Sequence, residues 1–294
     1  YMNVILYVMT SKGLSFLKKY IEDSSKNILY VVSDKDTSIN KDYFDEINNL
    51  CDTHSINFYR RNKAPKEISK SIIIAVSWRW IINCPNNKVI VIHDSILPKY
   101  RGFNPLVTAL IKGDNEIGIT AIYASSEYYR GEIIFQKKNK ISYPITINQA
   151  INIIRLNYEE CAKFISSELS SGSLPSGKPQ SENESSYSLW RNEDDYLIDW
   201  GLSSNQILRF IDAVGFPYKG ATSFVDGQKV RILKASEFKD VKIENRQSGK
   251  IIFINKGLPV VVCGKGLIII EEIENEYGKS LLPLSRFRIH FKNH

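Results

Sequence analysis

The chain has 294 residues, of which 43% are hydrophobic and 24% charged, a balance typical of globular proteins with a buried core. No apolar run approaches the roughly 20 residues that a membrane-spanning helix needs, and residues 4–8 lack the basic front of a secretory signal peptide. We therefore expect a cytoplasmic protein of one large or two ordinary domains, with no membrane partner. The net charge of +7 favours anionic partners, but no run of five basic residues indicates a nucleic-acid module, so nucleic acid is not the expected partner.

The four cysteines lie far apart in the sequence and form no Cys-x-x-Cys pair: Cys51, Cys84, Cys161 and Cys263. This pattern predicts reduced, mostly buried thiols. The spacing of cysteines and histidines supports no zinc site, so we expect no metal.

The first part of the chain alternates apolar runs, typical of strands, with amphipathic stretches, typical of helices. Strands are expected at residues 4–8, 27–32, 56–59, 72–76 and 89–92, and helices at 15–21 and 42–51. This alternation predicts an α/β fold with a Rossmann-like, doubly wound and mostly parallel sheet. The segment 9–13, Met-Thr-Ser-Lys-Gly, lacks the Gly-x-Gly-x-x-Gly pattern of a dinucleotide site.

The rest of the chain changes character after residue 170. Before it, we expect a helix from Pro105, strands at 117–123 and 132–136, and a helix capped by Thr146 and Gln149. Residues 170–188 are rich in Ser, Gly, Pro and Asn and are predicted to be an exposed connection. A helix capped by Ser203 or Ser204 follows, then short strands at 230–233, 251–254, 260–263 and 267–270. We predict a catalytic domain over 1–182 and a smaller β-rich domain over 183–294.

The most informative stretch is residues 93–102, His-Asp-Ser-Ile-Leu-Pro-Lys-Tyr-Arg-Gly, directly after the strand expected at 89–92. Open α/β sheets bind their ligands where parallel strands end. Of the four histidines, only His93 has such a position. The flanking residues 99–102, Lys-Tyr-Arg-Gly, favour a functional loop. The alternative is a hydrogen-bonded structural histidine among solvated loop charges.

A second candidate set follows the strand at 72–76. Trp78 and Trp80 offer two planar surfaces, and Arg79 between them offers a fork of donors, which suits a pterin or a phosphate. The alternative is two core tryptophans beside a surface arginine.

The pattern His93-x-Ser95-x-Leu97-Pro98-x-x-Arg101-Gly102 resembles the signature of folate-dependent formyltransferases, and residues 131–134, Gly-Glu-Ile-Ile, resemble their second motif. Residues 188–191, 198–200 and 217–221 resemble the C-terminal domain of methionyl-tRNA and sugar N-formyltransferases. Residues 93–95, His-Asp-Ser, and residues 99–103, Lys-Tyr-Arg-Gly-Phe, are most similar to the branch that acts on nucleotide-linked 4-amino sugars.

This resemblance implies transfer of a formyl group from N10-formyltetrahydrofolate to a dTDP-linked, less favourably a GDP-linked, 4-amino-4,6-dideoxy sugar. The product would serve O-antigen or other surface polysaccharide synthesis, and a homodimer is expected. The resemblance places the Trp78 loop at the folate pocket, bordered by Cys84. Substrate-binding candidates are Lys99, Tyr100, Arg101 and Gly102, of which Lys99 and Arg101 could hold a phosphate.

In such a reaction a neutral amine attacks the formyl carbon and an oxyanion develops. A donor near that oxygen contributes about 3–4 kcal/mol, and an imidazole can carry the proton from the amine to the folate nitrogen. The resemblance assigns both roles to His93. The family pattern also has an Asn two residues before the histidine and an Asp two residues before the second-motif glycine, where this chain has Val91 and Tyr129.

Glu132, three residues beyond Tyr129, is a second catalytic candidate, although strand alternation would turn its side chain to the opposite side. Two other functions stay open. One is a methionyl-tRNA formyltransferase, which needs a basic RNA surface. The other is a catalytically weak folate- or nucleotide-binding relative, which the residues Val91 and Tyr129 favour.

Overall fold

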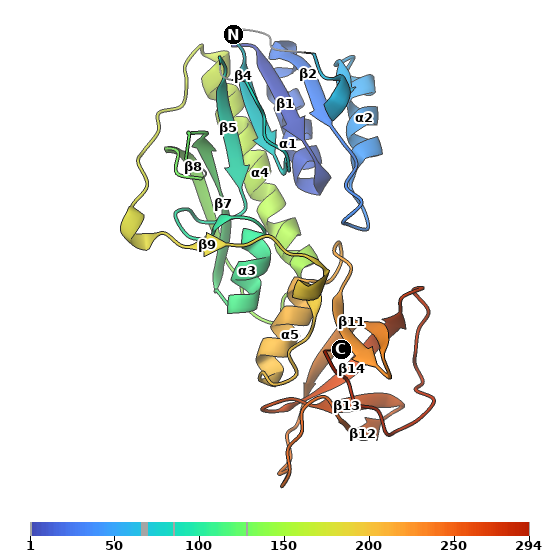
Figure 1. Ribbon diagram of the computed structural model, residues 1–294. Coiled ribbons are helices and arrows are strands. Elements are labelled where there is room, and N and C mark those ends of the chain that lie inside the picture. The colour runs from blue at the N-terminus through green and yellow to red at the C-terminus, as the bar shows by residue number, and fades with distance from the viewer. Residues whose placement is uncertain (1, 66–69, 85, 128, 294) are drawn as a thin grey trace. The chain divides into compact units, whose positions relative to one another are not determined.

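The computed structural model describes residues 2–65, 70–84, 86–127 and 129–293 (Figure 1). Contacts between Cα atoms divide the chain into two compact units. Unit 1 comprises Tyr1–Leu106, Glu116–Lys140 and Ala150–Leu189, and unit 2 comprises Val107–Asn115, Ile141–Gln149 and Trp190–His294.

Unit 1 is built on a seven-stranded sheet. Its order is β3 (Phe58–Arg60), β2 (Ile28–Ser33), β1 (Val4–Val8), β4 (Ile72–Val76), β5 (Lys88–His93), β7 (Glu116–Tyr123) and β8 (Ile133–Lys140). The first five strands run parallel, whereas β7 and β8 are antiparallel to their neighbours. The predicted mostly parallel α/β sheet is confirmed, and β4 is buried along its whole length, as expected for an inner parallel strand.

Helices α1 (Thr10–Ser24) and α2 (Phe44–Thr53) pack against β1–β4 and against each other. The helix predicted over 15–21 begins earlier, at Thr10, because the chain turns into α1 directly after β1 and Lys12 in its first turn pairs with Asp94. The remaining helices of this part of the chain are α3 (Pro105–Lys112) and α4 (Ile147–Ser170). The apolar stripe of α4 from Ala150 to Ile165 is fully buried, as its spacing predicts.

The segment before residue 189 is tied to unit 1 by backbone hydrogen bonds. Lys178 and Ile133 exchange two of them, at 2.8 and 2.9 Å. Further on, β9 (Tyr187–Ser188) pairs in parallel with β6 (Arg101–Gly102). Short 3-10 turns complete the chain: η1 (Ser25–Asn27), η2 (Arg61–Lys63), η3 (Glu182–Glu184) and η4 (Glu193–Tyr196). Much of this segment is exposed, but its backbone follows the loop that begins at His93.

Unit 2 contains an antiparallel five-stranded sheet, which confirms the β-rich C-terminal part. Its order is β10 (Ala221–Val225), β11 (Gln228–Phe238), β14 (Leu267–Asn275), β13 (Leu258–Val262) and β12 (Ile251–Asn255). Helix α5 (Ser204–Ala213) packs on β11 and β14. Ser203 caps it, in a capping box with Gln206, which decides between the two predicted caps.

The four cysteines are free thiols, three of them buried and Cys84 partly buried, as their spacing predicts. In the described part of the chain, no helix combines the length and apolar character needed to cross a bilayer. Within the same residues, no group of three or more His, Cys, Asp or Glu side chains is arranged to hold a metal ion.

Gly131 precedes β8 where the backbone of Tyr123 bonds to the Glu132 carbonyl, and a Cβ at Gly131 would overlap the Tyr123 carbonyl oxygen. We expect Gly131→Ala to lower the free energy of unfolding by about 1–3 kcal/mol, because the backbone must move to relieve the overlap. Urea unfolding measures this loss. Gly215→Ala is the control, since its new Cβ would lie no closer than 3.4 Å to any neighbour. Equal midpoints for the two variants would contradict this account.

Candidate functional site

Two loops leave the sheet side by side, after β4 and after β5. These strands are parallel neighbours, and Val76 at the end of β4 lies opposite Ile92. The loop carrying Trp78 and the loop beginning at His93 therefore start at the same edge of the sheet. This is the edge at which parallel α/β sheets gather their functional side chains.

His93 is the last residue of β5, and only 6% of its surface is exposed. Its Nε2 lies 2.8 Å from the Tyr100 carbonyl oxygen. Because a carbonyl can only accept, we assign the ring proton to Nε2 and the lone pair of the neutral ring to Nδ1. Burial is the largest influence on the imidazole and lowers the pKa of His93, so the neutral form is favoured at pH 7.

Hydrogen bonds from side chains of β7 and β8, rather than backbone pairing between strands, hold the loop after His93. The Thr120 hydroxyl donates to the Ser95 carbonyl at 2.6 Å and accepts from the Leu97 backbone N–H at 3.1 Å. Gln136 of β8 donates to the Leu97 carbonyl and to Thr120, both at 2.9 Å. These bonds hold the loop close to the strands and leave little freedom for His93.

Asp94 anchors the other side of the same loop. Its carboxylate pairs with Lys12 of α1 and accepts from the hydroxyl of Tyr158 on α4. The Lys12 and Asp94 side chains are 13% and 15% exposed. Burial and the Asp94 carboxylate raise the pKa of Tyr158 well above its usual value, so Tyr158 remains a donor.

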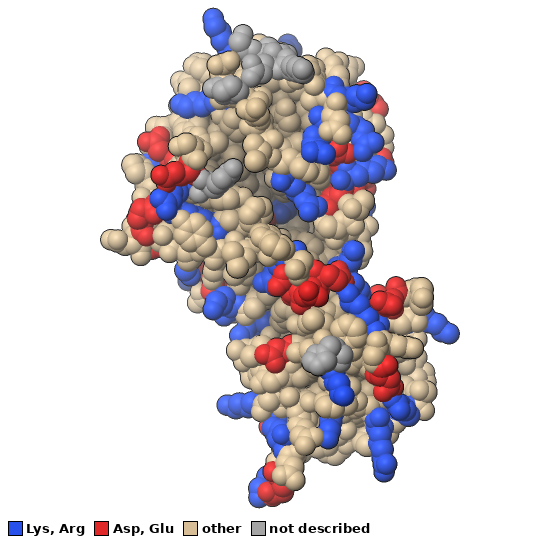
Figure 2. Space-filling model, in the orientation of Figure 1, with Lys and Arg blue, Asp and Glu red and all other residues tan. Residues whose placement is uncertain are grey.

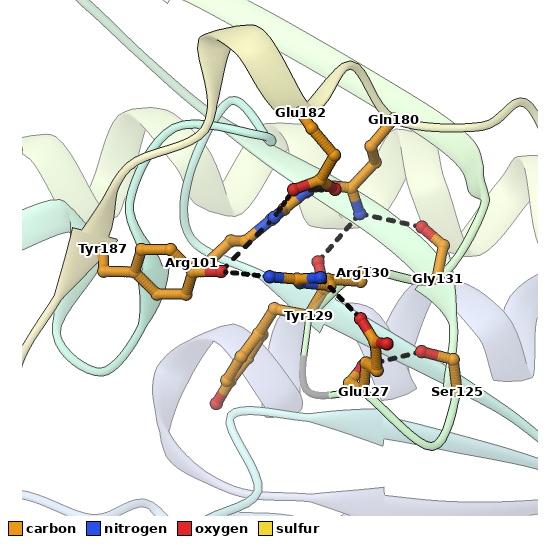
Figure 3. Close-up of polar contacts among 9 residues, drawn as sticks. All are labelled: Arg101, Ser125, Glu127, Tyr129, Arg130, Gly131, Gln180, Glu182 and Tyr187. Carbon is orange, nitrogen blue, oxygen red and sulfur yellow. Dashed lines mark hydrogen bonds and ion pairs between the residues drawn. The ribbon is translucent and has the colours of Figure 1, made fainter.

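Arg101 is fully buried and its guanidinium is occupied by protein groups (Figure 3). It donates to both oxygens of Glu182 at 2.8 and 2.9 Å, and to Gln180 Oε1 at 2.9 and 3.2 Å. The hydrogen bond to Glu182 raises the pKa of Arg101 further. The expected contact of Arg101 with a substrate phosphate does not fit this arrangement, because Glu182 already takes the bidentate face.

Gln180 connects Arg101 to the second motif. Its Nε2 donates to the Tyr129 and Gly131 carbonyls, both at 2.8 Å. Figure 3 shows the Tyr129 carbonyl facing Gln180 while the ring points away from the Arg130–Glu127 pair. That ring lies against His93, with centroids 4.6 Å apart and planes tilted by 44°.

The other residues predicted from the first motif differ in their surroundings. Lys99 is exposed and its ammonium lies 5.5 Å from the centre of the Tyr100 ring. Gly102 has φ +103°, and a Cβ there would overlap the Ser188 carbonyl, so glycine is required at this position. Glu132 is exposed and lies outside β8, with its carboxyl against Gly177. Among the described residues, no hydrogen bond or ion pair joins Glu132 to His93, so we assign Glu132 no direct chemical role.

The Trp78 loop forms an aromatic cluster beside the His93 loop. Trp78 packs edge-on against Tyr7 at 4.9 Å and against Trp80 at 5.0 Å. Cys84 belongs to the same apolar cluster. The Arg61 guanidinium lies 4.3 Å from the centre of the Trp80 ring. Trp78 is thus partly a core residue, as the alternative interpretation held.

Basic residues gather at this end of unit 1. Arg79 pairs with Asp36 and lies 3.0 Å from Ser38 Oγ, and Arg60 lies 2.7 Å from Asp34. Figure 2 shows a hollow on the imaged face of unit 1 with Lys or Arg side chains at its rim. The named arginines are already paired with Asp34 and Asp36, so this end of unit 1 carries charges of both signs.

Several residues of this site were not predicted from the sequence. Gln180, Glu182 and Tyr187 come from the segment that looked like a plain connection, and Tyr158 belongs to a helix stripe assigned to the core. Tyr187 accepts from Arg130 at 3.2 Å and from Arg101 at 3.5 Å. These two guanidinium groups lower the pKa of the phenol. Composition and periodicity give no signal for such side-chain pairs.

The buried imidazole predicts a particular pH dependence of stability. In the unfolded chain, His93 binds a proton near its ordinary pKa of 6.5, whereas burial lowers the pKa of the folded-state ring. Below pH 6.5 the unfolded state binds more protons, so the free energy of unfolding falls as the pH decreases. Between pH 7.5 and 5.5, we expect the free energy of unfolding of His93→Gln to fall by about 1 kcal/mol less than that of the unaltered protein. Urea unfolding at both pH values measures this, and equal losses would contradict the burial argument.

Two family models match the sequence. The model described as "Formyl transferase" matches residues 6–155, and "Formyl transferase, C-terminal domain" matches residues 191–288. Among curated proteins, a methionyl-tRNA formyltransferase of Alkaliphilus oremlandii is 28% identical over 219 residues, which are 71% of this chain and 68% of that protein.

Among solved structures, an N-formyltransferase from Helicobacter canadensis in complex with folinic acid and dTDP-3-aminofucose has a TM-score of 0.66 at 17% identity. That match covers 92% of this chain and 99% of the other. HypX from Aquifex aeolicus, in complex with tetrahydrofolic acid, has a TM-score of 0.63 at 17% identity. It covers 95% of this chain but only 45% of HypX. At these identities the structures show a shared fold.

The two family models together match residues 6–155 and 191–288, and the residues that suggested formyl transfer lie within these ranges except for 188–190. The chain belongs to the formyl transferase family.

Proposed function

We propose that this protein transfers the formyl group of N10-formyltetrahydrofolate to the amine of a nucleotide-linked 4-amino-4,6-dideoxy sugar, with dTDP favoured over GDP. The observation that carries the chemistry is the buried imidazole of His93, whose Nε2–H is held by the Tyr100 carbonyl. Its Nδ1 is left to accept a proton. We expect the product to enter O-antigen or another surface polysaccharide.

The aromatic cluster after β4 suits a folate. Trp80 lies next to Trp78, one strand away from the end of β5 that carries His93. When bound, the folate supplies the formyl group. Indole faces can pack on its flat rings, and Arg61 and Arg79 bring positive charge for its carboxylates. The folate-bound relatives named above have the same fold, which supports this assignment.

His93 can both take and return a proton in this reaction. The neutral ring accepts the proton that the attacking amine loses, at Nδ1. The protonated ring then has a second N–H, which can donate to the developing oxyanion and release the proton to the leaving nitrogen. Acid–base catalysis of this kind contributes about 10²–10⁴ to a rate.

A sugar substrate is supported by the similarity to the Helicobacter canadensis protein, which is matched over 99% of its length. That protein is described with a 3-amino sugar, so both amine positions belong in a test. The main alternative is methionyl-tRNA formylation, which is supported by the Alkaliphilus oremlandii relative and by the net charge of +7. A catalytically weak binding protein is the third candidate, supported by Val91 and Tyr129 beside His93.

A substrate panel separates these functions. We expect release of tetrahydrofolate with dTDP-4-amino-4,6-dideoxy sugars, less with the 3-amino and GDP-linked forms, and none with methionyl-tRNA. Formyl transfer is followed by tetrahydrofolate absorbance and by mass spectrometry of the sugar. Turnover with charged tRNA alone, falling steeply with salt, would overturn the sugar assignment. Folate or nucleotide binding without any turnover would support the binding protein.

Removal of the imidazole tests the catalytic role. We expect His93→Gln to lower kcat by about 10²-fold or more while folding is retained, because glutamine cannot titrate. An unchanged kcat would remove His93 from the mechanism.

The folate assignment has its own test. We expect Trp80→Leu to raise the KM for N10-formyltetrahydrofolate by about 3- to 10-fold, since it removes one aromatic surface worth about 1 kcal/mol. The KM for the sugar should change little. Ile81→Ala is the matched control, because Ile81 is in the same loop and is 79% exposed. A folate KM unchanged in Trp80→Leu would place the folate elsewhere.

A further inference from the structure

His93 has an unusual neighbour in Tyr129. The two rings are 4.6 Å apart, and the backbone of Tyr129 has φ +62°. The side chain of Gln180 donates hydrogen bonds to the backbone carbonyls of Tyr129 and Gly131. Gln180 is in turn fixed by the buried Arg101. The backbone from which the Tyr129 ring reaches His93 is therefore held by a chain of hydrogen bonds.

We propose that Tyr129 determines how His93 handles protons, by covering one face of the imidazole and occupying the place from which an acidic side chain would reach it. The kinetic part of this inference rests on the proposed function, while the part that concerns the imidazole itself does not. Tyr129 acts here as a positioning residue, because it touches His93 rather than the reacting atoms.

Among the residues that the structure describes, no acidic side chain forms an ion pair or hydrogen bond with the His93 ring, whose hydrogen-bond partner is the Tyr100 carbonyl. Asp94 is adjacent in sequence, but its carboxylate is taken by Lys12 and by the hydroxyl of Tyr158. Asp94 and Lys12 act on His93 in opposite directions, and burial outweighs both. From β7, the residue opposite His93 is Thr120, which carries no charge. From the loop, the contact is the uncharged Tyr100 carbonyl.

The consequence concerns the form in which the amine must arrive. In the transfer, the bond from the amine nitrogen to the formyl carbon forms and the bond from the formyl carbon to the folate nitrogen breaks. The proton that the amine loses ends on the folate nitrogen, with His93 as carrier. Because burial disfavours the imidazolium and the Asp94 carboxylate is shared with Lys12 and Tyr158, we expect His93 to take a proton from an amine that is already attacking as the neutral base. An ammonium substrate must lose its first proton to water.

Four forms of the full-length protein test the effect on the imidazole: the unaltered chain, Tyr129→Phe, Tyr129→Asn and Tyr129→Asp. The His93 pKa is read from the ring resonances in NMR titrations, and the spectrum of His93→Gln assigns the signal. We expect Tyr129→Phe to leave this pKa unchanged, because the ring cover is retained. Tyr129→Asp should raise it by about 1–3 units above the matched Tyr129→Asn variant, since a nearby carboxylate favours the charged ring. Equal values in the Asp and Asn variants would overturn the proposal.

The same variants test the kinetic part. We expect kcat/KM of the unaltered protein to rise with pH in step with deprotonation of the amine. Tyr129→Asp should raise kcat/KM at pH 6.5 by about 10-fold relative to Tyr129→Asn, and Tyr129→Phe should match the unaltered protein. A rate identical in the Asp and Asn variants, with a shifted His93 pKa, would overturn the kinetic part. If none of the sugars is formylated by any form, the proposed function fails, while the titrations still decide the role of Tyr129.

Discussion

The buried guanidinium of Arg101 is the interaction on which the site depends. It brings three distant stretches of chain to one point: the loop after β5, the turn before β8, and the segment that leads to β9. Its partner Glu182 is half exposed, so the ion pair itself is screened and its Coulomb energy is modest. The geometry matters more than the charge. A planar fork fixed by two acceptors allows one placement of Gln180, and Gln180 then fixes Tyr129 and Gly131.

Arg101 and the His93 ring are both buried. A desolvated imidazole favours its neutral form, and the hydrogen bond from Nε2 to Tyr100 sets which nitrogen can act as the base. The site thus combines two requirements that oppose each other. The ring must be dry to remain a base at neutral pH, yet a dry ring makes the folded state less stable in acid. Asp94 and Lys12, which pair with each other, act on the His93 pKa in opposite directions.

The sequence predicted the parts of the molecule that repeat or run continuously. The apolar strands β1, β4 and β5, the buried stripe of α4 and the Ser203 cap could be recognised because each leaves a local pattern. The motif from His93 to Gly102 could be recognised because its residues are close together. The pairing of β6 with β9 could not be recognised, because strands of two residues are too short to show an alternation of apolar and polar side chains. Gln180 and Glu182 were hidden for a different reason: nothing local indicates that a polar residue in a Ser- and Gly-rich segment faces a buried arginine 80 residues earlier.

Val91 and Tyr129, the two departures from the family pattern, can be understood as one change. On β5, Val91 and His93 point to the same face of the sheet, because side chains alternate along a strand. Tyr129 reaches His93 from the turn before β8. An amide at position 91 and a carboxylate at position 129 would both provide polar groups able to hold a charged imidazole. Valine and a tyrosine ring provide neither group, and within the described residues the His93 ring forms its hydrogen bond with the Tyr100 carbonyl.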